Sequence, residues 1–137
     1  MPNKNKHLQI VAQNYKVLSH LSKPNPPDYT DWCVTIVYYM ALHFVHAYLA
    51  EKNQHITIHS TLQKIIEDDP NLKSIYSDYR HLQDDSQGAR YIGLKLSIYD
   101  MRNTTLKSFK KIQNKIIRLL KISDANKHDL YPLFPSS

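Results

Sequence analysis

The sequence predicts an all-α protein, an up-and-down bundle of about four to five helices around one apolar central helix. Three observations predict this fold. Apolar residues recur at spacings of three and four, which is the period of one helix face. Glycine occurs only at Gly88 and Gly93, whereas all-β folds need more turn glycines. The run from Trp32 to Ala50 is apolar on almost every side, which is typical of a helix buried at the centre of a bundle.

The first two helices are expected on either side of a proline-rich break. Lys4–Leu21 carries an apolar face and ends before a stretch with three prolines, through which a helix cannot continue. The central helix is expected over Tyr29–Lys52, with Thr30 or Asp31 as its N-cap. β-Branched residues at its start leave a strand open as an alternative, but the length of the run favours a helix.

The second half of the chain is expected to hold two or three further helices and a tail. Residues 1–122 would form the bundle and 123–137 the tail, whose apolar part docks on the bundle or on a partner. The expected segments are a helix over Ile58–Asp68 with Ile58 facing inward, a helix over Asn71–Gln83, an irregular connection over Ser86–Ser97, a helix over Thr104–Lys121 capped by Asn103 or Thr104, and the apolar tail segment Leu130–Phe134.

Charge and cysteine content restrict the functional class only loosely. The net charge is +6, and acidic residues concentrate between positions 67 and 85 whereas positions 102–121 carry basic residues alone. This balance permits nucleic acid or an acidic partner. A single cysteine, Cys33, allows no internal disulfide, and the first residues lack an apolar signal segment. We therefore expect a cytoplasmic protein without a membrane partner.

Several fragments resemble HEPN-type domains, which are helical bundles of prokaryotic toxin–antitoxin and defence systems, many of them RNA-cutting. The resemblance covers residues 28–121 and implies a small prokaryotic member of this family. The fragments that carry it are Asp31-Trp32, Tyr38–His43 and Ala47–Leu49 in the central helix, then His59, Tyr79–Leu82 and Ser86–Tyr91.

Catalytic HEPN proteins carry an arginine and, after four to six intervening residues, a histidine, and two subunits bring these motifs together. Here Arg102-Asn103 begins such a motif, but Phe109 stands where the histidine belongs at the longest spacing. The resemblance therefore implies a non-catalytic binding or regulatory module. It would be a homodimer that binds RNA, a nucleotide, or a protein partner such as a nucleotidyltransferase.

Two other classes of function remain open. The first is a metal-independent endoribonuclease with a non-standard site, in which Arg90 or Arg102 acts with His43 or His59. The second is a structural protein–protein interaction domain that uses its tail.

Arginines and tyrosines mark the expected contacts with RNA or a nucleotide, because a guanidinium can hold a phosphate while an aromatic ring stacks on a base. The alternative is that these cations pair with Asp78, Asp84 or Asp85, or belong to a solvated helix face. A basic stripe on the last helix, Lys107, Lys111, Lys115 and Arg118, would contact phosphates without reading sequence. The candidate residues are Tyr79, Arg80, Arg90, Tyr91, Arg102, Lys107 and Lys111.

Four histidines have spacings that would allow them to share a metal ion. His43 and His46 lie three residues apart, and His55 and His59 lie four apart beyond a loop. No cysteine or carboxylate completes the set nearby. We therefore predict neither a metal nor a cofactor, and interpret His43 and His46 as histidines that hydrogen-bond at the edge of the core.

Overall fold

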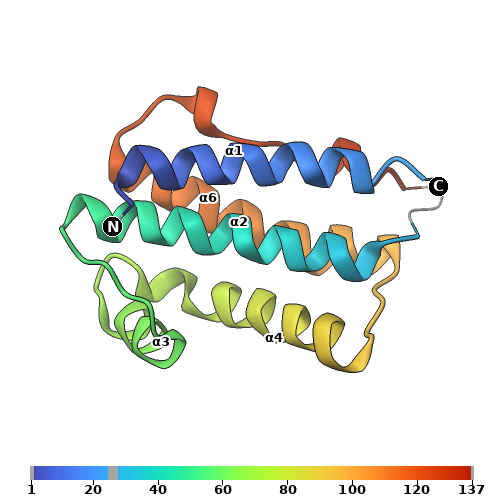
Figure 1. The fold of residues 1–137 in the computed structure, drawn as a ribbon, viewed down its shortest axis with the longest axis horizontal. Coiled ribbons are helices and arrows are strands. Elements are labelled where there is room, and N and C mark those ends of the chain that lie inside the picture. The colour runs from blue at the N-terminus through green and yellow to red at the C-terminus, as the bar shows by residue number, and fades with distance from the viewer. Residues whose placement is uncertain (1, 25–27, 137) are drawn as a thin grey trace.

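The computed structural model describes residues 2–24 and 28–136 and confirms the all-α bundle. Four long helices run alternately up and down: α1 (Lys4–Leu21), α2 (Thr30–Glu51), α4 (Tyr76–Ile92) and α6 (Leu106–Leu120) (Figure 1). The short helix α3 (His59–Asp68) lies at one end of α2 and α4. The described residues contain six α-helices, two of them short, and no strand.

Helix α2 is the core of the bundle because α1, α4 and α6 all pack against it. Cys33, Val37, Phe44 and Leu49 have no exposed surface, as a helix that is apolar on nearly all sides requires. Among the described residues it is the one helix long and apolar enough to span a membrane, but 72% of its apolar window is buried inside the fold. That burial fits the central helix of a bundle.

One narrow face of α2 remains partly uncovered by the other helices. Its members recur at spacings of three and four residues, so they follow a single line along the helix. We call this line the open stripe; it consists of Trp32, Ile36, Tyr39, His43 and His46, of which Trp32 is exposed and the others are partly exposed.

The expected irregular connection over Ser86–Ser97 is wrong in its first half, because α4 continues to Ile92. Gly88 lies within the helix, where an added Cβ would stand 3.1 Å from the Cδ2 atom of Leu94. Gly93 ends the helix in the left-handed conformation, with φ of 69°. The start of this helix is also corrected, since Asn71 lies in a turn and a 3-10 segment, Lys73–Ile75, comes before Tyr76.

The expected caps of α2 and α6 are wrong as well. Tyr29 is the N-cap of α2 without a side-chain hydrogen bond, and Thr30 is the first helical residue. The last helical segment starts earlier than expected, as α5 (Ile98–Asp100) and a π-helical stretch (Met101–Thr105) run directly into α6. Ser97 caps it, because its Oγ accepts a hydrogen bond from the backbone N–H of Asp100 at 3.0 Å. Ile58, expected to face inward, is 62% exposed.

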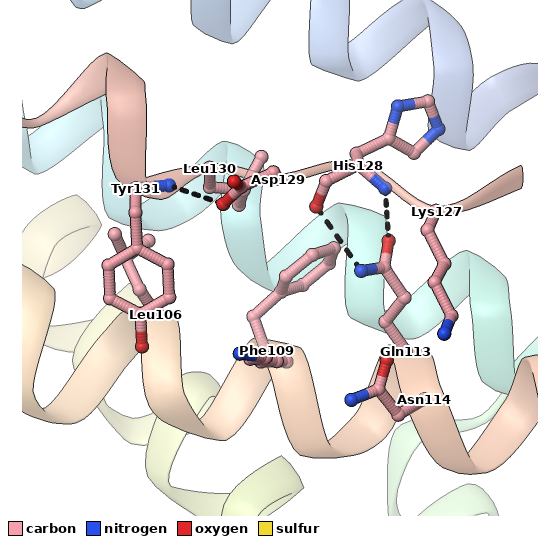
Figure 2. A pocket seen from close by; sticks show the side chains of 10 residues that line it. Leu106, Phe109, Gln113, Asn114, Lys127, His128, Asp129, Leu130 and Tyr131 are labelled. Carbon is pink, nitrogen blue, oxygen red and sulfur yellow. Dashed lines mark hydrogen bonds between the residues drawn. The ribbon is translucent and has the colours of Figure 1, made fainter. Parts of the chain in front are cut away.

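The tail docks on the bundle of its own chain. This is one of the two alternatives that the sequence predicts, the other being a partner. Figure 2 shows the side chain of Gln113 donating a hydrogen bond to the carbonyl of His128 at 3.2 Å and accepting one from its N–H at 2.8 Å. Arg102 donates to the carbonyls of Tyr131 and Phe134 at 3.0 and 2.9 Å. Leu130 and Phe134 are buried in the core. The tail is therefore part of the folded bundle.

We expect the Phe134→Ala substitution to lower the free energy of unfolding by about 3–5 kcal/mol, because it leaves a cavity under the docked tail. Urea denaturation followed by circular dichroism measures this change. Tyr99→Ala is the control, since Tyr99 is 74% exposed and should change stability by less than about 0.5 kcal/mol. Equal stabilities of the two variants would show that the tail adds nothing to the fold.

Candidate functional site

Arg90, in the last turn of α4, contacts the open stripe of α2. Its Nη1 donates a hydrogen bond to the hydroxyl of Tyr39 at 3.2 Å, and its Nε donates to the carbonyl of Ser86 at 3.3 Å. The guanidinium carbon lies 5.8 Å from the ring centre of Tyr39 and 5.3 Å from that of Tyr91, within the range of a cation–π interaction. None of the ion pairs between described residues includes Arg90. The site is therefore an exposed cation held by two tyrosines.

Two of the predicted binding residues are engaged within the fold instead, Tyr79 in the core and Arg80 in an ion pair on the surface of α4. Tyr79 is fully buried, and its hydroxyl lies 3.2 Å from that of Tyr38, so it cannot contact a ligand. Burial raises the pKa of both phenols and keeps them neutral. Arg80 pairs with Asp84 at 3.5 Å and also donates to Tyr76. For Arg80 the alternative prediction, pairing with an acidic residue, is confirmed.

The remaining predicted cations lie apart from Arg90. Arg102 donates from Nη1 to two carbonyls of the tail, which gives it a structural role, and its role in binding or catalysis stays a prediction. Lys107 and Lys111 are exposed on α6, and Lys111 lies 4.0 Å from Asp78 in the first turn of α4. Twelve residues separate Asp78 from Arg90 along α4, a rise of about 18 Å. The basic stripe and Arg90 are therefore two different surfaces.

Three imidazoles gather near the start of α1, where His7 lies beside the open stripe. The Nδ1 atoms of His7 and His43 lie 3.0 Å apart, a hydrogen bond in which one ring carries the proton. The ring of His46 stacks on that of His7 at 5.2 Å between centres. Burial, followed by the neighbouring histidines, lowers the pKa of His43 and of His46 to about 4 and also lowers that of His7. All three rings are therefore neutral at pH 7.

The four-histidine metal site that the sequence left as an alternative is wrong. Among the described residues, no three His, Cys, Asp or Glu side chains are placed to hold a metal ion. His55 and His59 are both exposed, and the partner of His43 is His7 instead. Sequence reasoning missed His7, which is 36 positions away. The only signal was its place on the buried face of α1, four residues before Val11.

Of the predicted catalytic residues, the structure brings Arg90 and His43 to the same stripe. Tyr39 contacts Arg90 and lies one helical turn before His43. His59 begins α3 in an exposed position, and Arg102 holds the tail. The candidate site is therefore the open stripe of α2 with Arg90 and His7 at its sides.

Comparison of the chain with profiles of known protein families, with curated proteins and with solved structures finds no match. Kinship with HEPN domains thus remains a prediction from the motifs. The fragments that carry the resemblance lie in α2, at the start of α3 and in α4. The site must accordingly be interpreted from its own geometry.

The cluster of His7, His43 and His46 predicts a loss of stability in acid. In the unfolded chain their imidazoles take up protons as the pH falls below the ordinary value of 6.5, whereas His43 and His46 in the fold resist protonation until about pH 4. The unfolded state binds more protons in this window, so the free energy of unfolding falls as the pH is lowered through it.

We expect His43→Gln to flatten this pH dependence by about 1 kcal/mol per pH unit. The measurement is urea denaturation at several pH values between 7 and 4. His20→Gln, which changes an exposed histidine of the same helix as His7, is the control and should keep the slope of the unaltered protein. Equal slopes for both variants would contradict the assignment.

Proposed function

We propose that this chain is a non-catalytic HEPN-like binding module of a prokaryotic defence or toxin–antitoxin system, and that it binds RNA or a nucleotide through Arg90. The observation that carries this proposal is the exposed guanidinium between Tyr39 and Tyr91. No carboxylate among the described residues neutralises it, unlike Arg80 beside Asp84. An unpaired cation with an aromatic ring beside it suits an anion that also carries a flat base.

The geometry leaves room for both parts of such a ligand. The hydrogen bonds of Arg90 to Tyr39 and Ser86 are 3.2 and 3.3 Å long, and they use only Nη1 and Nε. The remaining guanidinium group can donate to a phosphate oxygen. The ring of Tyr91 is 75% exposed, so one face is free to stack on a base.

The proposal includes a cytoplasmic homodimer whose partner in the cell is RNA, a nucleotide or a nucleotidyltransferase-type protein. These expectations come from the HEPN resemblance. A purely structural role through the tail is not proposed, because Leu130 and Phe134 are buried in their own bundle.

We expect Arg90→Ala to weaken RNA binding about tenfold or more, because it removes both the phosphate donor and the cation of the aromatic pair. Fluorescence anisotropy of a labelled RNA at two salt concentrations measures the dissociation constant. Arg118→Ala is the matched control, since Arg118 is an exposed arginine on the basic stripe of α6. Loss of binding in Arg118→Ala alone would move the site to α6, and negligible binding by the unaltered protein at both salt concentrations would exclude RNA as the ligand.

A metal-independent endoribonuclease is the second candidate, favoured by the contact of Arg90 with Tyr39, which lies one helical turn before His43. The Nδ1 of His43 is engaged by His7, and Nε2 makes no hydrogen bond to a described residue. In the tautomer in which Nδ1 of His43 donates to His7, Nε2 has the free lone pair and can take the 2′-hydroxyl proton. The 2′-oxygen then attacks the phosphorus, the bond to the 5′-oxygen breaks, and water protonates the leaving oxygen, giving a 2′,3′-cyclic phosphate and a 5′-hydroxyl.

For this second candidate, we expect RNA cleavage in the presence of EDTA, and a loss of at least about a hundredfold in rate for His43→Ala. His59→Ala is the control, because His59 is exposed at the start of α3 and should retain the rate. The assay follows cleavage of purified RNA on a denaturing gel. Unchanged cleavage by His43→Ala would exclude His43 as the base, and no cleavage by the unaltered protein would leave the binding proposal alone.

A further inference from the structure

Exposed aromatic side chains gather at one end of the bundle. Among the described residues, seven large apolar side chains are exposed, and five of these lie in three short stretches of chain. We call these five the aromatic end: Tyr29, Trp32, Tyr91, Ile92 and Tyr99. Single exposed apolar residues need no explanation, but a group of this kind marks a binding surface.

The fold explains why the three stretches meet. Helix α2 begins at Thr30, α4 ends at Ile92 and α5 begins at Ile98, and Figure 1 shows these three helix ends at the same end of the molecule. The Nζ of Lys95 donates a hydrogen bond to the carbonyl of Asp28 at 3.3 Å, which ties the loop after α4 to the chain before α2. The contact of Arg90 with Tyr39 joins the same two helices farther along.

The charges of this end are mixed. Arg90 has no carboxylate partner among the described residues, and Lys95 contacts a carbonyl. Asp28, Asp31 and Asp100 belong to the same chain stretches. Such a surface attracts a polyanion only weakly, so a nucleic acid that binds here must gain most of its affinity from ring stacking. That requirement selects a ligand whose bases are uncovered.

We propose that the aromatic end binds the unpaired bases of single-stranded RNA, with Trp32 and Tyr91 as stacking platforms and Arg90 and Lys95 as phosphate contacts. This inference rests on the proposed function and gives it a substrate class. Trp32 and Tyr39 lie on one face of α2, seven residues or about 10 Å apart, so Trp32 extends the surface that begins at Arg90. A duplex hides its base faces within the stack and cannot use these rings.

The sole tryptophan of the chain provides a direct probe, because Trp32 belongs to the aromatic end and is 59% exposed. Titration with a 12-nucleotide oligouridine should quench its fluorescence as bases stack on the indole. Trp32→Ala and Tyr91→Ala should each weaken binding, measured by anisotropy, about tenfold, and Trp32→Phe should largely restore it. Ile58→Ala, which removes an exposed apolar side chain on another part of the surface, should leave binding unchanged.

Two further measurements separate stacking from other modes of binding. With two phosphate contacts, the logarithm of the binding constant should fall against the logarithm of salt concentration with a slope of about −1.4. A duplex RNA of the same length should bind at least about tenfold more weakly.

The possible failures are distinguishable. RNA binding that requires Arg90 but neither quenches Trp32 nor discriminates against the duplex would overturn this inference and leave the proposed function intact. Absence of any RNA binding would overturn this inference and also exclude RNA as the ligand in the proposed function. Self-association in sedimentation that Trp32→Ala abolishes, without RNA binding, would assign the surface to a second copy of the chain and likewise overturn the inference.

Discussion

Helix α2 lies at the centre of the molecule, and the packing of α1, α4 and α6 against it organises everything else. Phe44 and Leu49 are fully buried, and the aromatic ring of Phe44 packs 6.1 Å from that of Phe109 on α6. Burial of apolar surface on this scale is the main favourable term in folding. Because three helices cannot surround a fourth completely, one line of α2 is left partly open. The residues on that line are the ones from which a function can be built.

The open stripe differs in kind from the rest of α2. The buried faces carry mainly apolar side chains, including the ring of Phe44, whereas the stripe carries an indole, a phenol and two imidazoles beside Ile36. A stripe needed only for packing would be satisfied by apolar residues. Instead Tyr39 accepts a hydrogen bond from Arg90, and His43 shares one with His7. The polar groups along this line are thus held in position by side chains from α1 and α4.

Much of the fold was predictable from the sequence, because it follows from local patterns. The apolar run predicts the buried helix, and the scarcity of glycine predicts the absence of strands in the described residues. The errors come from contacts that no local pattern contains. Gly88 lies inside a helix because Leu94 packs against it, and Ser97 caps the last helical segment because a π-helical stretch joins it to α6.

The candidate site was predictable only in part, for the same reason. Arg90 and His43 were identified by residue type, but the hydrogen bond from His7 crosses 36 positions of sequence. Tyr79 was misassigned because its residue type suits a binding site while its buried surroundings do not. The hydroxyl of Tyr79 forms a hydrogen bond with the buried hydroxyl of Tyr38, and the guanidinium of Arg102 donates to two carbonyls of the docked tail.

The three arginines show how surroundings decide the role of one residue type. Arg80 has Asp84 four residues later on the same helix, and this carboxylate compensates its charge. Arg102 donates to two carbonyls of the tail, and these hydrogen bonds hold the last segment of the chain against the bundle. Arg90 has an apolar residue, Leu94, at the position where Arg80 has its acid, and it meets only tyrosine rings, a hydroxyl and a carbonyl. These neighbours orient the guanidinium without cancelling its charge. An oriented but uncompensated cation attracts an anion, which is why the site is centred on Arg90.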